Sequence, residues 1–112
     1  MIALIETREG LEQVEEIMAV PGIDVGWLGH YDLTDSMGIP GDFEHPQFLA
    51  AVDRIVEACR KHGKAAGFLD LNLDLVRQFC EKGFRLLCYG HDVMVFQNGL
   101  KQGLDRIRGD QA

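Results

Sequence analysis

The sequence has no long hydrophobic run and no basic stretch near its first residue. None of its apolar runs approaches the roughly 18 residues that a membrane-spanning helix requires, so we expect no membrane partner. A secretory signal peptide begins with basic residues, whereas this chain begins Met1–Ile5 and reaches a charged side chain at Glu6. The two absences favour a cytoplasmic protein.

Basic residues are also scarce relative to acidic ones. Lys and Arg number 11, Asp and Glu number 18, and the net charge is −7. Nucleic-acid binding depends on clusters of Lys and Arg that neutralise phosphates, so this composition argues against a nucleic-acid partner. A moderately acidic surface mainly supports solubility, and it does not by itself indicate a cationic partner.

Cysteine occurs only at positions 59, 80 and 88, each time in an apolar setting. An odd number of cysteines without zinc-type spacing does not form a disulfide framework or a zinc site. We therefore predict reduced, buried thiols at Cys59, Cys80 and Cys88.

What the sequence does contain is an alternation of short apolar runs and segments with helical periodicity, in a chain of 112 residues that is long enough for one domain. Strands are expected at 2–5, 23–28, 65–69 and 84–89, and helices at 8–19, 46–62, 72–82 and 93–108. Residues 34–46 are expected to form a loop and residues 109–112 a frayed tail.

This β-α alternation predicts an α/β fold with a parallel sheet of four βα units. Four parallel strands alone would leave two bare edges and an apolar face uncovered, because parallel strands are ordinarily buried on both faces. One solution is an open sheet wound on both faces. The other is half of a (βα)₈ TIM-type barrel, completed by another chain or by dimerisation. We favour the half-barrel, because the sequence enters directly at a strand, as if cut through the middle of a fold.

Two carboxylates follow neighbouring predicted strands. Glu6 ends the first apolar run, and Asp32 stands just past the second, where α/β folds keep their chemistry. Parallel strands lie about 4.8 Å apart, and two buried carboxylates repel each other unless a cation neutralises them. We predict that Glu6 and Asp32 share Mg²⁺ or Mn²⁺. The alternative is that Glu6 pairs with Arg8 or caps a helix, and that Asp32 starts an Asx-turn.

Other candidates surround these strand ends. Gly29 would let a ligand approach the backbone, and N–H groups over residues 30–33 would hold a carboxylate; the alternative is an ordinary turn glycine. His30 and His91 follow strand ends at matching points, so each is a candidate acid, base or ligand, or else a solvated loop histidine. Tyr31 is expected at the mouth of the site.

Several motifs resemble the HpcH/HpaI aldolase family. They are Ile5-Glu6-Thr7-Arg8-Glu9-Gly10, Val20-Pro21-Gly22-Ile23-Asp24, Gly29-His30-Tyr31-Asp32-Leu33-Thr34, Met37-Gly38-Ile39-Pro40-Gly41, His45-Pro46, Gly63-Lys64-Ala65-Ala66-Gly67 and the strand end Tyr89–Asp92. The resemblance covers nearly all of the chain in one register, and it corresponds to the second, C-terminal half of that family's barrel.

The family consists of class II aldolases that use Mg²⁺, Mn²⁺ or Co²⁺ to make and break carbon–carbon bonds between pyruvate and an aldehyde. The resemblance implies that Glu6 and Asp32 are the metal ligands, that backbone amides at Gly29 and around Tyr31 bind the pyruvate carboxylate, and that Leu69 lines the substrate pocket. Its substrates would be 2-keto-3-deoxy or 4-hydroxy-2-oxo acids, and its small-molecule partners pyruvate, oxaloacetate or a hydroxy-keto acid. The metal would act as a Lewis acid.

The chain also departs from the family. Leu4 stands where many members have Gln, and His30 where many have Pro. The absent N-terminal half supplies a histidine and an arginine, which His30 or His91 would replace only in part. We therefore expect the chain alone to bind metal weakly and to act with a complementing half-barrel or as a homo-oligomer. Two alternatives are a non-catalytic assembly module, and a CoA-thioester lyase similar to the citrate lyase β subunit.

Overall fold

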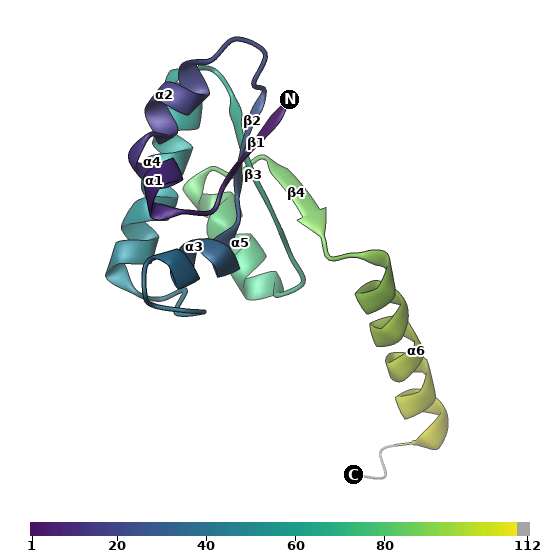
Figure 1. Ribbon diagram of the computed structural model, residues 1–112. Helices are drawn as coiled ribbons and strands as arrows, with labels where there is room; N and C mark the ends of the chain where they lie inside the picture. The colour runs from purple at the N-terminus through teal and green to yellow at the C-terminus, as the bar shows by residue number, and fades with distance from the viewer. Residues whose placement is uncertain (110–112) are drawn as a thin grey trace.

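The computed structural model describes residues 1–109, and its helices alternate with strands of a single parallel sheet (Figure 1). The elements are β1 (Ile2–Ile5), α1 (Arg8–Glu12), α2 (Val14–Ala19), β2 (Val25–Leu28), α3 (His30–Ser36), α4 (Pro46–Lys61), β3 (Ala65–Asp70), α5 (Leu73–Lys82), β4 (Leu86–Tyr89) and α6 (Asp92–Arg108). The strands lie in the order β1-β2-β3-β4, which is the sequential order of a (βα)₈ barrel and not the reversing order of a doubly wound sheet. Of the predicted frayed tail, residues 110–112 lie outside the described residues.

The sheet is covered by helices on one face only (Figure 1). Ile5 pairs in register with Leu28, and both side chains join Phe68 in the core under α2, α4 and α5. Successive side chains of a strand point to opposite faces, so Leu4 and Trp27, which precede Ile5 and Leu28, point away from these helices. Ile2 and Leu4 are 55% and 52% exposed, so the prediction that the first strand is buried on both faces was wrong. An open sheet wound on both faces is likewise not what forms.

Local sequence explains where α4 begins and where α5 ends. Pro46 occupies the first turn of α4, where a missing N–H costs nothing, and the His45 ring accepts the Gln47 N–H at 3.2 Å. Helix α5 ends before Gly83, whose φ of +114° is a left-handed conformation that favours glycine. These ends set the lengths of the β2–β3 and β3–β4 connections, and the parallel pairing of the strands places all their carboxyl ends at one edge of the sheet.

Two elements differ from the sequence prediction. The first predicted helix is interrupted at Gln13, which separates α1 from α2. The segment after β2, where a turn and loop were expected from residue 34, forms the helix α3. Its Leu33 and Thr34 are fully buried, and the Thr34 hydroxyl accepts the Gly41 N–H at 3.0 Å, so tertiary packing outweighs the turn preference of the polar residues. The loop therefore covers only residues 37–45.

The last βα unit is different again. All four residues of β4 are exposed, and α6 has no buried residue and projects away from the sheet (Figure 1). The radius of gyration of 16.6 Å reflects this projection, since a compact domain of this length has roughly 13 Å. Cys88 on β4 and Cys80 on α5 are exposed, and only Cys59 is buried, so the prediction of three buried thiols was wrong at two positions. Within residues 1–109 no helix is both long and apolar enough to cross a membrane.

Candidate functional site

A cavity opens at the carboxyl ends of the strands, beside the start of α3. It brings together every residue for which the sequence predicted a role in binding or catalysis, namely Glu6, Gly29, His30, Tyr31, Asp32, Leu69 and His91. These residues come from the ends of all four strands, which are far apart in sequence. The cavity wall also contains apolar side chains from the open face of the sheet, among them Leu4 and Trp27.

Both predicted metal ligands line this cavity. Glu6 directly follows β1 and is half-buried, whereas Asp32 lies in the first turn of α3 and is exposed. Both also line a second, adjoining hollow. No cluster of three or more His, Cys, Asp or Glu side chains forms a metal site within residues 1–109. The chain thus offers two carboxylates, a donor set that fits Mg²⁺, which keeps several water ligands and takes others from its substrate.

Gly29 is the residue that permits this arrangement. A Cβ atom there would lie 2.8 Å from Cβ of Glu6 and 3.3 Å from its Oε2, so only glycine leaves room for the Glu6 side chain. The Gly29 N–H donates to the Ile5 carbonyl at 3.0 Å, and the Gly29 carbonyl accepts the Leu33 N–H at 2.8 Å. The expectation that the Gly29 amide faces a substrate carboxylate therefore does not hold. The glycine joins the end of β1 to the start of α3 instead.

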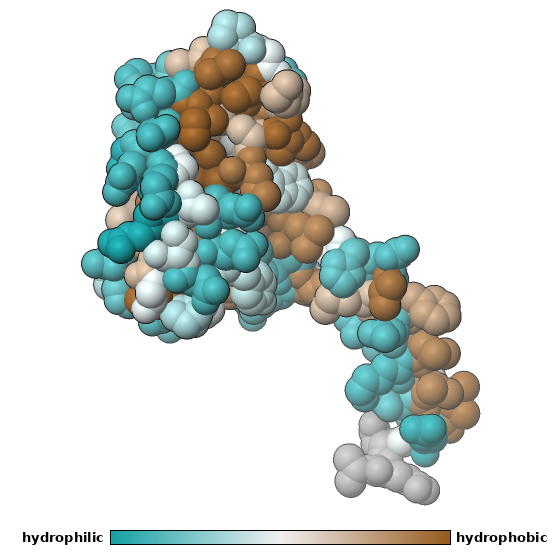
Figure 2. Space-filling model, viewed as in Figure 1, coloured by the Kyte–Doolittle hydropathy of each residue, from teal (hydrophilic) through white to brown (hydrophobic). Residues whose placement is uncertain are grey.

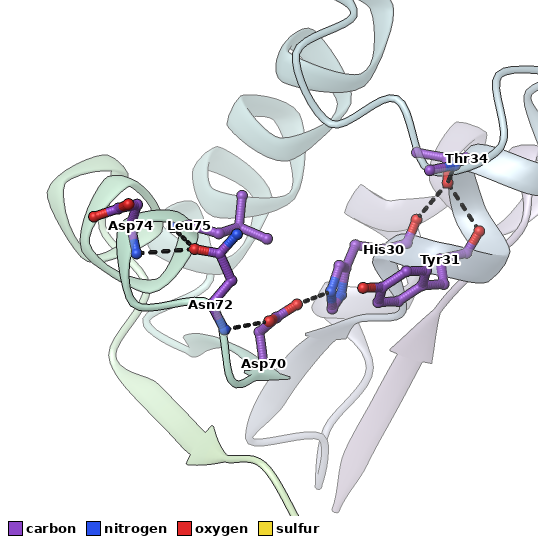
Figure 3. A network of polar contacts seen from close by, with 8 residues as sticks. His30, Tyr31, Thr34, Asp70, Asn72, Asp74 and Leu75 are labelled. Carbon is purple, nitrogen blue, oxygen red and sulfur yellow. Dashed lines mark hydrogen bonds and ion pairs between the residues drawn. The ribbon is translucent and has the colours of Figure 1, made fainter. Parts of the chain in front are cut away.

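The polar centre of the cavity wall is a buried pair that sequence reasoning missed (Figure 3). Nε2 of His30 and Oδ2 of Asp70 are 2.6 Å apart, and the two side chains are only 6% and 9% exposed. The other Asp70 oxygen accepts the Asn72 N–H at 2.7 Å. The rings of Tyr31, Phe43 and Phe68 surround the imidazole. The available signal was that Asp70 ends β3 much as Glu6 follows β1. The N-cap of α5 is the nearby Asn72, which leaves Asp70 for the contact with His30.

The remaining predicted residues lie around the rim. His91 is exposed at the N-cap of α6 and makes no capping hydrogen bond. Tyr31 is exposed, with its ring centroid 4.7 Å from that of His30. Leu69 is half-buried on the open face of the sheet and pairs in register with Cys88. The cavity thus has a carboxylate pair at one end, an apolar wall, and one accessible histidine.

Comparison with known proteins assigns the chain to a family. Residues 1–99 match the family model described as HpcH/HpaI aldolase/citrate lyase. The chain belongs to this family. It is 38% identical over 107 residues to a hydroxypyruvate/pyruvate aldolase of Paraburkholderia phytofirmans, covering 96% of this chain and 41% of that protein. It is 30% identical over 112 residues to a 2-keto-3-deoxy-L-rhamnonate aldolase of Klebsiella pneumoniae, covering 100% of this chain and 42% of that protein.

Solved structures of the family show the same fold. A family protein from Burkholderia cenocepacia superposes with a TM-score of 0.88 and 33% identity, over 96% of this chain and 42% of that one. The citrate lyase β subunit of M. tuberculosis, solved with oxaloacetate and magnesium, superposes with a TM-score of 0.65 over 80% of this chain and 46% of that one. At 21% identity this second likeness concerns the fold alone. The chain is therefore a partial TIM-barrel-like unit that spans less than half of its relatives.

Proposed function

We propose that this chain supplies the metal-binding part of a class II pyruvate aldolase. That enzyme is a carbon–carbon lyase that cleaves 2-keto-3-deoxy or 4-hydroxy-2-oxo acids to pyruvate and an aldehyde. The observation that carries the proposal is the shared cavity of Glu6 and Asp32 at the strand ends, with Gly29 shaped to admit the Glu6 side chain. The relatives named above as aldolases support the reaction class.

Each site residue is given one role. Glu6 and Asp32 would hold Mg²⁺, Mn²⁺ or Co²⁺, whose positive charge stabilises negative charge developing on the substrate's keto oxygen. The N–H groups of the first turn of α3, including that of Tyr31, have no partner within the helix and would orient the keto-acid carboxylate. Leu69 would form the apolar wall beside the carbon chain of the substrate.

We assign proton transfer to His91 rather than to His30. The His91 side chain is exposed on the cavity and free of capping contacts, whereas the His30 ring is buried and already bound to Asp70. A general acid or base must reach the substrate directly or through one water, and only His91 has that access.

The site would be completed by further barrel units. We propose that this chain corresponds to the C-terminal half of the family barrel, and that a complementing N-terminal half or a second copy closes the open face of the sheet. The exposed apolar residues Ile2 and Leu4 on that face, and Leu86 on β4, are the surfaces that such a partner would cover. Three free thiols fit a cytoplasmic enzyme.

The test is an aldolase assay of the reconstituted barrel. The chain would be mixed with Mn²⁺ and with the part of the Paraburkholderia relative that it does not match, which on this proposal is the N-terminal half. Pyruvate release from a 4-hydroxy-2-oxo acid would be followed with lactate dehydrogenase. We expect metal-dependent release that Glu6→Gln and Asp32→Asn each abolish. The control is Asp74→Asn, which removes an exposed first-turn carboxylate from α5 instead of α3. Equal activity in all variants, or none in a folded complex, would reject the proposal.

One other function has an observation in its favour. A non-catalytic assembly module would explain why α6 presents an entirely exposed apolar side (Figure 2). It predicts complexes whose mass, measured by sedimentation, is indifferent to Glu6→Ala and Asp32→Ala, together with no metal binding. A CoA-thioester lyase is not favoured, because no lysine or arginine of the described residues lines the cavity to meet the CoA phosphates.

A further inference from the structure

We propose that Asp70 is a positioning residue. Through its buried contact with His30 it holds the start of α3, and with it Asp32, against Glu6. The inference rests on the proposed function of Glu6 and Asp32 as metal ligands, and it assigns to the pair a role that the sequence did not suggest.

Helix α3 needs an external anchor. It has seven residues, too few for a helix to be stable by its own hydrogen bonds. His30 is its first residue, and Asp32 lies two positions later in the same turn. A contact that fixes the His30 side chain therefore also fixes the backbone from which the Asp32 carboxylate projects.

Asp70 is itself held firmly. Its Oδ1 accepts the Asn72 N–H at 2.7 Å, and the Asn72 side chain accepts the N–H groups of Asp74 and Leu75 at 3.0 and 3.3 Å. Figure 3 shows this chain of contacts running from the first turn of α5, through the end of β3, to the start of α3. The Asp70 carboxylate thus connects the start of α3 to the junction between β3 and α5.

The far end of α3 is anchored separately. The Thr34 hydroxyl lies 2.9 Å from the carbonyl oxygens of both His30 and Tyr31 and accepts the Gly41 N–H. Loss of Asp70 would therefore loosen the first turn of α3, which carries Asp32 and is still joined to β1 through the Gly29 N–H, while leaving the following loop attached. This separation makes the role of Asp70 measurable.

The pair is better suited to positioning than to proton transfer. Nε2 of His30 is already hydrogen-bonded to Asp70, and the imidazole ring packs against the rings of Phe43 and Phe68. Partners that orient metal ligands typically contribute about 10–100-fold to metal affinity. If the pair served stability alone, replacing both side chains by apolar residues would change the free energy of unfolding and leave Mn²⁺ affinity unaltered in the folded chain.

The experiment compares Asp70→Leu with the double variant His30→Leu, Asp70→Leu. The single change leaves a buried histidine without its partner, and the double change removes both polar groups. Mn²⁺ affinity is measured by water proton relaxation, folding by a thermal melt, and local order by hydrogen exchange of the Leu33 amide, with the Ile55 amide of α4 as internal reference. Asp70→Asn, which keeps the shape of the side chain, substitutes for any variant that does not fold, and Asp74→Asn is the charge control.

We expect the double variant to fold cooperatively, to lose protection at Leu33 but not at Ile55, and to bind Mn²⁺ at least about tenfold more weakly than the unaltered chain. Unchanged Mn²⁺ affinity in the folded double variant would overturn the inference while leaving the proposed function intact. Absence of Mn²⁺ binding by the unaltered chain would instead reject the proposed function. In that case Leu33 exchange alone decides whether Asp70 holds α3, and unchanged protection in Asp70→Leu refutes it.

Discussion

The region from β1 to α5 and the region from β4 to α6 use their apolar residues in opposite ways. In the first region Phe48, Phe68 and Phe79 are buried in the core, and Phe68 is 1% exposed. In the second region Phe96 is 71% exposed, although α6 is amphipathic too, less strongly than α4 and α5. Figure 2 shows the resulting apolar strip along one side of α6.

The residues of that strip recur at three- and four-residue steps, at Val93, Phe96, Leu100, Leu104 and Ile107. Such spacing is the pattern of a helix with one side packed against other elements. The difference between the two regions is therefore one of partners rather than of sequence character. This agrees with our proposal that a partner covers α6, whereas the first region already contains its core.

The largest expected contrast comes from removing one aromatic ring in each region. Phe68→Ala should lower the free energy of unfolding by about 3–5 kcal/mol, because it leaves a cavity in the core. Phe96→Ala should change it by no more than about 0.5 kcal/mol, because the ring is exposed. Urea unfolding followed by circular dichroism measures both. A comparable loss in Phe96→Ala would show that α6 packs against the body of the molecule in solution.

The next contrast uses glycine. A Cβ added at Gly26 on β2 would lie 2.6 Å from Sγ of Cys59 and 2.9 Å from Sδ of Met18, so Gly26→Ala should destabilise the chain by about 1–3 kcal/mol. At Gly103 on α6 a Cβ meets nothing within 4 Å. Gly103→Ala should stabilise the helix by about 0.5–1 kcal/mol and raise the helical signal in circular dichroism. The free energy of unfolding should fall in Gly26→Ala and rise in Gly103→Ala, and a change of the same sign in both variants would contradict the comparison.

Thiol reactivity should distinguish the regions without any substitution. Cys59 is buried, and burial raises the pKa of its thiol, so Ellman's reagent should modify it only on unfolding. The exposed Cys88 of β4 should react in the folded chain, as should Cys80. The raised pKa means that the unfolded chain loses the Cys59 proton at a lower pH than the folded chain does. The free energy of unfolding should therefore decline as pH rises above about 8.5, the ordinary cysteine pKa, and Cys59→Ala should remove that decline. Rapid labelling of all three thiols at neutral pH would contradict this packing.

The smallest effect concerns a surface ion pair between α2 and α4. The hydrogen bond from Lys61, followed by the positive charges nearby, lowers the pKa of Glu15. A lowered carboxyl pKa adds stability above the ordinary glutamate pKa, and that stability is lost as pH falls through the lowered value. Glu15→Gln should therefore melt slightly earlier than the unaltered chain at pH 7, with the difference vanishing in acid. In α6 the Lys101–Asp105 pair lies within one helix, and Asp105→Asn should not shift the melt of the body.

The sequence predicted most of the fold because its signals were local. Pro46 and Gly83 mark helix ends through their own backbone preferences, and the apolar runs at 2–5 and 65–69 lie within the observed strands β1 and β3. The fold class and the parallel sheet follow from the order of these elements. What local signals missed was α3, whose polar residues favour turns until Leu33 and Thr34 are buried by the rest of the chain.

Burial and long-range pairing were the parts that sequence reasoning could not supply. Cys80 and Cys88 stand in apolar segments and were expected to be buried, but burial depends on what packs against a segment. His30 and Asp70 are 40 residues apart, and only the fold brings β3 beside the start of α3. Glu6 and Asp32 were expected on one cavity because both follow neighbouring strands, and both line it. The contact between His30 and Asp70 was not expected, because no local signal pairs the two residues.

The central claim is that Glu6 and Asp32 together hold a divalent cation, and paramagnetic broadening by Mn²⁺ tests it most directly even if binding is weak. Nuclear magnetic resonance spectra of the chain, titrated with Mn²⁺, should lose the amide signals of Glu6 and of residues 29–33 first. Asp32→Asn should abolish this selective broadening, and Asp74→Asn should leave it unchanged. Broadening that spreads evenly over the acidic surface, or that persists at residues 29–33 in Asp32→Asn, would contradict the account.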